Sequence, residues 1–120
     1  MSSYMGTETR HALRLLRASL VVGGIPVKVV TVPATVLAKH HKVPVEHAPF
    51  GDCLRRSDHW RIRLQRGVED LAMRDTLEHE YAHALDEFLN GPATEPHRKS
   101  WGACVALCHQ EIYGRLQDAR

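Results

Sequence analysis

The sequence has no long uninterrupted hydrophobic run. The apolar stretch at residues 20–32 is broken by Gly23, Gly24, Pro26 and Lys28, whereas a membrane-spanning helix needs about 20 apolar residues in succession. The first 17 residues carry charges throughout and lack the apolar core of a secretory signal. We therefore expect an intracellular, cytoplasmic protein that is not bound to a membrane.

Cysteine is scarce, with only Cys53, Cys104 and Cys108 in the chain. An odd number without framework spacing excludes a fold held together by disulfides. Cys104 and Cys108 are four residues apart in a helical segment, and Cys108 precedes His109. A second metal site would use such residues, but thiols on one apolar helical face favour burial in the core.

Composition and charge point to an ordinary globular protein. The 120 residues are 43% hydrophobic and 25% charged, without repeats or low-complexity tracts. This predicts a single compact domain over residues 1–120, with residues 1–6 flexible. A formal net charge of +2 does not by itself indicate nucleic-acid binding.

The hydrophobic pattern alternates between helical and strand periods. Spaced leucines predict a helix over residues 7–20 with Thr7 as a candidate N-cap, and β-branched residues predict a strand over residues 25–32. Residues 50–55 and 60–65 predict a hairpin around Ser57 and Asp58, and prolines divide residues 33–49 into short pieces. Helices are expected over residues 69–89 and from Thr94 and Pro96 onward. The predicted fold is α+β: an N-terminal helix, a small, mainly antiparallel sheet of about three strands, and two further helices.

The penultimate predicted helix carries the motif H-E-x-x-H at residues 79–83. His79 and His83 lie one turn apart on one face, opposite the apolar stripe. They can reach one Zn²⁺ while Glu80 faces a metal-bound water, which is typical of zinc metallopeptidases. Two solvated surface histidines are the alternative interpretation.

A catalytic zinc site needs a third protein ligand, and no third histidine follows the motif closely. Glu87, Glu95, His97 and His109 are candidates. Glu87 continues the same straight helix and cannot easily complete a tetrahedral site. His97 fits best, because it falls in the first turn of the last predicted helix, after a short turn that folds the two helices antiparallel.

Arginines crowd the middle of the chain, at Arg55, Arg56, Arg61 and Arg63. Arg61 and Arg63 alternate with the apolar residues of a predicted strand and should share its polar face. The row is either a solvated basic face or a surface that contacts nucleic-acid phosphates. Trp60 lies on the opposite face and is expected in the core.

These residues resemble the SprT-like zinc metallopeptidases. The resemblance rests on Thr76, Leu77, His79, Glu80, His83 and Ala84, then His97 and Trp101, with Gly51 and the strand at residues 60–64 upstream. It implies a compact minigluzincin-type domain. It also implies one zinc ion per chain, with His79, His83 and His97 as ligands and Glu80 as the general base.

The resemblance implies a protease, and some family members degrade proteins crosslinked to DNA. We therefore expect a protein or peptide substrate, with sequence-nonspecific DNA as a candidate partner, although the chain lacks a Cys-x-x-Cys pair. Candidates for stabilising the oxyanion are Arg98, His109, Tyr113 and Tyr4. The alternatives are a nucleic-acid-associated zinc-binding module without proteolysis and a metal-dependent hydrolase of a non-protein substrate.

Overall fold

The computed structural model describes residues 4–92, 95 and 97–118. Its elements, in chain order, are α1 (Thr7–Ser19), β1 (Val27–Val32), α2 (Ala34–His41), the 3₁₀ turn η1 (Val45–His47), β2 (Gly51–Arg55), β3 (Trp60–Gln65), α3 (Asp70–Asn90) and α4 (Lys99–Asp118). The predicted α+β class is confirmed. Of the segment 1–6 predicted to be flexible, residues 1–3 lie outside the described residues, and Met5 is buried.

The three strands form a mixed sheet in the order β1-β3-β2. The predicted hairpin is present, with β2 antiparallel to β3. β1 pairs with β3 in parallel, with Val27 opposite Trp60, so the expectation of a mainly antiparallel sheet holds for one ladder only. After β1, the connection through α2 leaves a gap of one strand before β2. The β2–β3 hairpin then places β3 in this gap, between β1 and β2.

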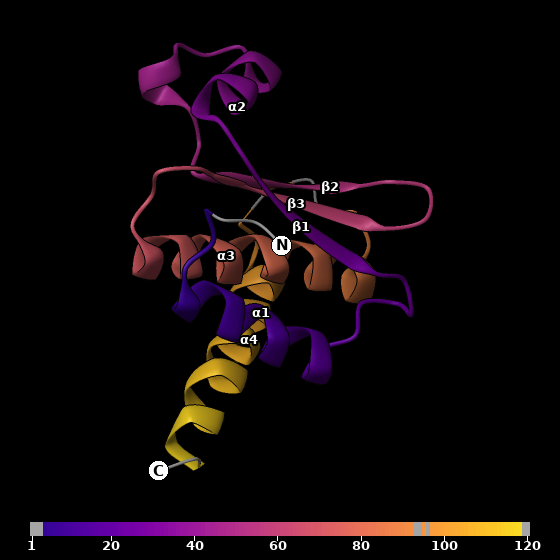
Figure 1. The fold of residues 1–120 in the computed structure, drawn as a ribbon. Helices are drawn as coiled ribbons and strands as arrows, with labels where there is room; N and C mark the ends of the chain where they lie inside the picture. The colour runs from indigo at the N-terminus through magenta and orange to yellow at the C-terminus, as the bar shows by residue number, and fades with distance from the viewer. Residues whose placement is uncertain (1–3, 93–94, 96, 119–120) are drawn as a thin grey trace.

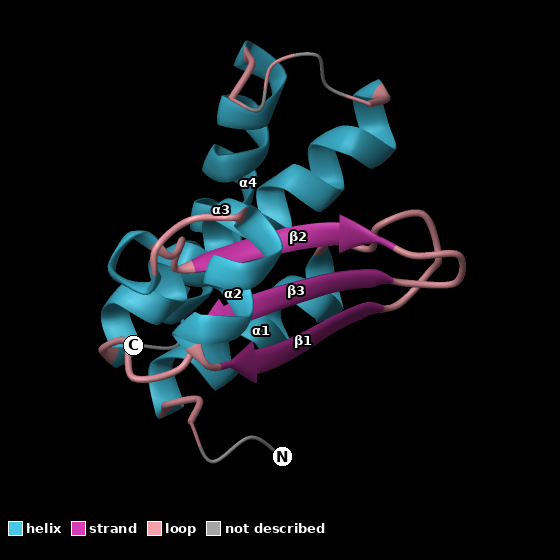
Figure 2. Ribbon diagram, turned by 90° about the horizontal axis from the view of Figure 1, so that it is seen from above, coloured by secondary structure: helices cyan, strands magenta, loops and turns pink. Residues whose placement is uncertain are grey.

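Helices cover the two faces of the sheet unequally. Figures 1 and 2 show α2 over one face, while α3, α1 and α4 lie on the other. The core fills the space between the sheet and α3, with Leu16, Ile62, Leu64, Leu77 and Tyr81 almost fully buried. In the described part of the chain, no helix has the length and apolar character needed to cross a membrane.

The N-terminus of α1 is capped by a side chain from α3. Gly6, and not the predicted Thr7, occupies the N-cap position and offers no side-chain acceptor. The carboxylate of Asp70 instead accepts hydrogen bonds from the backbone N–H groups of Glu8 and Thr9, at 2.9 and 3.0 Å. The Thr9 hydroxyl donates to the same carboxylate at 2.7 Å. This joint fixes α1 against the start of α3.

Candidate metal centre

Helix α3 positions the first part of the site. It starts at a Glu69 cap, whose side chain accepts from the Leu71 N–H, and ends at Gly91, where φ is 80°. Its buried stripe includes Leu77 and Tyr81, and the Tyr81 hydroxyl donates to the Leu20 carbonyl at 2.7 Å. This packing points the opposite face of the helix, with the two motif histidines, away from the core.

The third histidine returns to this face from the segment before α4. His97 lies in a turn two residues ahead of Lys99, so it precedes the helix that was predicted to contain it; the predicted start at Thr94 and Pro96 lies outside the described residues. Arg98 fixes this turn, since its Nε donates to the Asp86 carboxylate at 2.9 Å and its Nη2 donates to the Gly91 carbonyl.

The start of α4 is also held against the motif. The indole Nε1 of Trp101 donates to the backbone carbonyl of His79 at 3.3 Å. The indole ring stacks on His83, with centroids 5.3 Å apart and an interplanar angle of 24°. These contacts hold the indole of Trp101 against the helix turn that carries both motif histidines.

The three imidazoles converge through their Nε2 atoms. The Nε2 atom of His79 lies 3.2 Å from that of His83 and 3.1 Å from that of His97. Nitrogens bound about 2.0–2.1 Å from a tetrahedral zinc ion are separated by roughly 3.4 Å, so the spacing fits a single ion. Burial, and then the charges of the neighbouring imidazoles, lowers the pKa of His83 to about 4. Burial also lowers the pKa of His79, which favours the neutral form that metals bind.

Glu80 lies beside this cluster as a buried carboxyl group. Its Oε1 is 3.9 Å from the Nε2 atom of His79, while its Oε2 is buried and has no hydrogen-bond partner among the described residues. Burial, with a smaller contribution from Asp52, raises the pKa of Glu80 to about 7. A buried acceptor without a partner is costly unless a ligand or water satisfies it, so the group suits proton transfer.

Comparison with protein families assigns the chain to a family. A sequence model of the SprT-like family matches residues 35–119, which is more than half of the chain. The chain belongs to the SprT-like family. Searches of curated proteins and of solved structures give no match. SprT-like membership identifies a zinc-associated domain of the metallopeptidase type.

The structure separates the other ligand candidates of this SprT-like protein from the histidine cluster. Among the described residues, the groups that could share an ion are the three histidines and a second set of His40, His41 and Asp52. Glu87, Glu95 and His109 join neither set. Cys104 and Cys108 are buried in the core, and burial raises the pKa of Cys108 to about 12. A metal needs the thiolate, so packing is their role.

The oxyanion candidates all have partners within the protein. Arg98 holds Asp86, His109 lies 3.1 Å from the Glu78 carboxylate, and the Tyr113 hydroxyl accepts from Arg74. Tyr4 lies under the Arg66 guanidinium, with 4.4 Å from guanidinium carbon to ring centroid. Of these, Arg98 adjoins a predicted ligand directly.

The predicted arginine row is corrected by the structure. Arg63 is buried, and its guanidinium donates to both carboxylate oxygens of Asp52, which stands opposite it in the β2–β3 register. It therefore cannot contact phosphates. Arg55 and Arg56 are exposed and Arg61 is half-buried, while Trp60 is buried in the core as expected.

Sequence reasoning missed Asp52 and His41. The His41 imidazole bonds the Asp52 carboxylate at 2.9 Å, and both residues line a pocket of about 310 Å³ together with Glu80 and His83. Asp52 already accepts from Arg63, so a cation there would have to displace a guanidinium. The sequence held a signal for the pairing of Asp52 with Arg63, because a hairpin turn at Ser57 and Asp58 places these two residues opposite each other.

Proposed function

We propose that this SprT-like protein is a zinc-dependent metallopeptidase that hydrolyses peptide bonds. One observation carries the proposal. Three imidazole Nε2 atoms with the separation of zinc ligands stand beside a buried carboxylate, that of Glu80, whose Oε2 has no partner in the described structure. A solvated pair of histidines would have no reason to meet a third one from another segment.

The proposed roles follow from the donor set. His79, His83 and His97 would hold one zinc ion, which supplies Lewis acidity to the peptide carbonyl and lowers the pKa of water. Glu80 accepts the proton of the attacking water and delivers it to the leaving amine. Burial raises the pKa of this carboxyl group in the chain without metal, and the positive charge of a bound zinc ion would lower it again. The ionised carboxylate would then be available to take the proton of the water.

The sheet offers a place for the substrate backbone. The order β1-β3-β2 leaves β2 at an edge of the described sheet, and α3 packs against β2. A peptide that adds to this edge as a strand would satisfy backbone groups of β2 and run past Glu80.

The central experiment compares Glu80→Gln with Glu87→Gln. Both are glutamates of α3, and only Glu80 is fully buried beside the histidines. Glu80→Gln should keep zinc and lose about 10²–10⁴-fold in casein hydrolysis, as expected for loss of a general base. Glu87→Gln should keep both. Metal content is measured by mass spectrometry, with chelated protein as the blank.

The same assay separates the alternative functions. Zinc binding without hydrolysis of any substrate, with nucleic-acid binding equal in wild type and Glu80→Gln, would favour a zinc-binding module. Chelator-sensitive hydrolysis of non-protein esters or amides, without cleavage of casein, would favour a different hydrolase. Loss of zinc in Glu80→Gln would contradict the proton-transfer role.

A further inference from the structure

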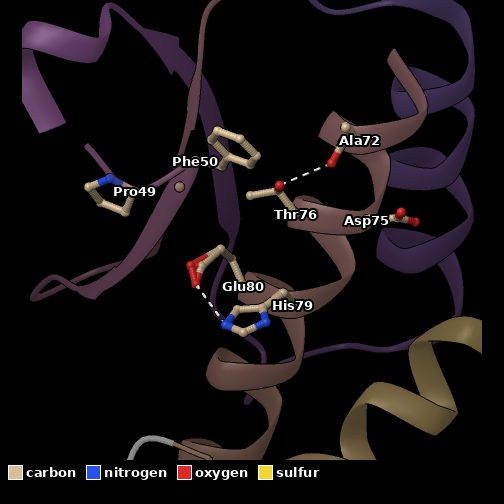
Figure 3. A pocket seen from close by; sticks show the side chains of 8 residues that line it. Pro49, Phe50, Ala72, Asp75, Thr76, His79 and Glu80 are labelled. Atoms are coloured by element: carbon tan, nitrogen blue, oxygen red, sulfur yellow. Dashed lines mark hydrogen bonds and ion pairs between the residues drawn. The ribbon is translucent and has the colours of Figure 1, made fainter. Parts of the chain in front are cut away.

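A cavity lies beside α3, on the N-terminal side of Glu80. It has a volume of about 450 Å³ and reaches His79 and Glu80 at one end (Figure 3). Its other walls come from the residues that lead into β2 and from the first half of α3. The cavity is thus continuous with the proposed reaction centre, and its volume lies in the usual range for small-ligand sites.

The floor of the cavity is closed by a close approach of β2 to α3. A Cβ atom added to Gly51 would lie 2.7 Å from the Thr76 methyl carbon and 2.8 Å from the Arg63 carbonyl oxygen. A glycine is therefore needed at this position. The Thr76 hydroxyl donates to the Ala72 carbonyl at 3.0 Å, so its one proton is already used within α3.

The walls are mainly apolar. Pro49 and Phe50 form one side, with Ala72 and Thr76 opposite them in Figure 3. Phe50 lines the cavity and leaves 57% of its surface exposed. A ligand bound in the cavity would cover part of this ring. Ligand sites are lined mainly by hydrophobic and aromatic side chains, and this wall supplies both. The carboxylate of Asp75 is the one charged group of the lining besides the reaction centre.

We propose that this cavity binds an apolar side chain of the substrate, on a residue next to the scissile bond. The inference rests on the proposed peptidase function, and it adds a substrate preference to it. Most of the wall, at Pro49, Phe50 and Ala72, offers a polar side chain no hydrogen bond in return for the water that it would lose. A leucine or phenylalanine side chain would cover Phe50 and hold the backbone against β2.

The first test fills the cavity. Ala72→Phe places a ring within it without touching a predicted ligand, and Leu71→Phe is the matched control, since Leu71 is 47% exposed and does not line the cavity. Wild type and Leu71→Phe should cleave peptides with leucine or phenylalanine at the pocket position at least about 10-fold faster than those with glycine or serine, as contacts with a few methylenes allow.

Ala72→Phe should lose this preference and keep its rate on the glycine peptide. Circular dichroism and zinc content show that each variant is folded and loaded. Cleavage by wild type without any side-chain preference, or an unchanged preference in Ala72→Phe, would overturn the pocket assignment and leave the peptidase function standing. Cleavage of no peptide by wild type would overturn the proposed function instead.

A second measurement does not depend on hydrolysis. N-acetyl-leucinamide and N-acetyl-serinamide are titrated into ¹⁵N-labelled, zinc-loaded wild type and Ala72→Phe. The leucine compound should shift the amide signals of Phe50, Gly51 and Thr76 in wild type only, and the serine compound should shift them far less. Equal shifts from both compounds, or none from either, would overturn the proposal whatever the protease assay shows.

Discussion

The pairing of Arg63 with Asp52 is the clearest case in which one residue decides the behaviour of its surroundings. Both side chains are less than one tenth exposed, and the guanidinium contacts both carboxylate oxygens. These bonds, with those from His41, outweigh the effect of burial and hold the pKa of Asp52 below its ordinary value. Asp52 is therefore a fixed negative charge close to Glu80.

Removing one partner of this pair should be costly. We expect Arg63→Met to lower the free energy of unfolding by about 3–5 kcal/mol, because a buried carboxylate is left without its main partner. Arg61→Met, two residues earlier on the same face of β3, should change it by less than about 0.5 kcal/mol. Urea unfolding followed by circular dichroism measures both.

The double variant Arg63→Met with Asp52→Asn sharpens the prediction. It removes both charges and should recover part of the lost stability. A double variant that is less stable than Arg63→Met alone would show that the pair is not the source of the cost.

At the scale of the element, α1 depends on a carboxylate outside itself. The hydrogen bonds from Thr9 and from the Glu8 and Thr9 backbone outweigh the burial of Asp70 and lower its pKa. A group with a lowered pKa in the folded state contributes stability above its ordinary pKa of about 4, and that contribution is lost as the pH falls through the folded value.

We expect Asp70→Ala to lower the free energy of unfolding at pH 7 by about 0.5–2 kcal/mol, the usual cost of a lost helix cap. The difference from wild type should stay constant from pH 7 to about 5 and shrink below pH 4. Urea titrations at each pH measure it, with Asp75→Ala, on an exposed position of α3, as the control. A difference that grows in acid would contradict the cap.

The elements that local patterns define were predictable. The spacing of apolar residues gave α1 and α3, and the alternation around Ser57 and Asp58 gave the β2–β3 hairpin. The parallel pairing of β1 with β3 was not, because it depends on where the α2 connection lies. The same reason explains Arg63: alternation assigns it to the outer face, but no local signal shows that His41 and Asp52 cover it there.

The candidate site also contains residues that local patterns predict and contacts that only the fold brings together. His79, Glu80 and His83 follow from helical periodicity, and the choice of His97 over Glu87 followed from the limits of one straight helix. The position of the turn that carries His97 could not be predicted from the sequence. It depends on Arg98, which donates hydrogen bonds to Asp86 and to the Gly91 carbonyl at the end of α3. The apolar cavity also needs Pro49 and Phe50 to meet Ala72 and Thr76, about two dozen residues later.

At the scale of the whole molecule, a bound ion would join α3 to the segment before α4. Zinc should therefore raise the melting temperature. When free zinc is about 1,000 times its dissociation constant, binding adds about 4 kcal/mol to the free energy of unfolding. His97→Ala should lose most of this gain, whereas His47→Ala, at an exposed position of η1, should keep it. Scanning calorimetry of chelated and zinc-loaded protein measures the gain. An equal gain in His97→Ala would place the third ligand elsewhere.

The exposed arginines carry the remaining proposal, that of DNA contact. With Arg63 buried, Arg55 and Arg56 are the exposed members of the predicted row. Binding through phosphates should be indifferent to sequence, weaken steeply with salt, and fall in the Arg55→Glu, Arg56→Glu double variant. Fluorescence anisotropy with labelled single- and double-stranded DNA measures it. No binding at low salt would identify a solvated face or a surface for an acidic protein partner, and would contradict the DNA proposal.

The hydroxyl of Tyr81, inside the H-E-x-x-H motif, reaches the Leu20 carbonyl just after α1, and Asp70 of the same helix caps the start of α1. Yet the segment shared with the family begins only at residue 35. The portion that matches the family model therefore packs against α1, which lies outside it. A graft of residues 35–119 onto another scaffold would transfer the motif without α1. The host would then have to supply a helix of its own to pack against Tyr81.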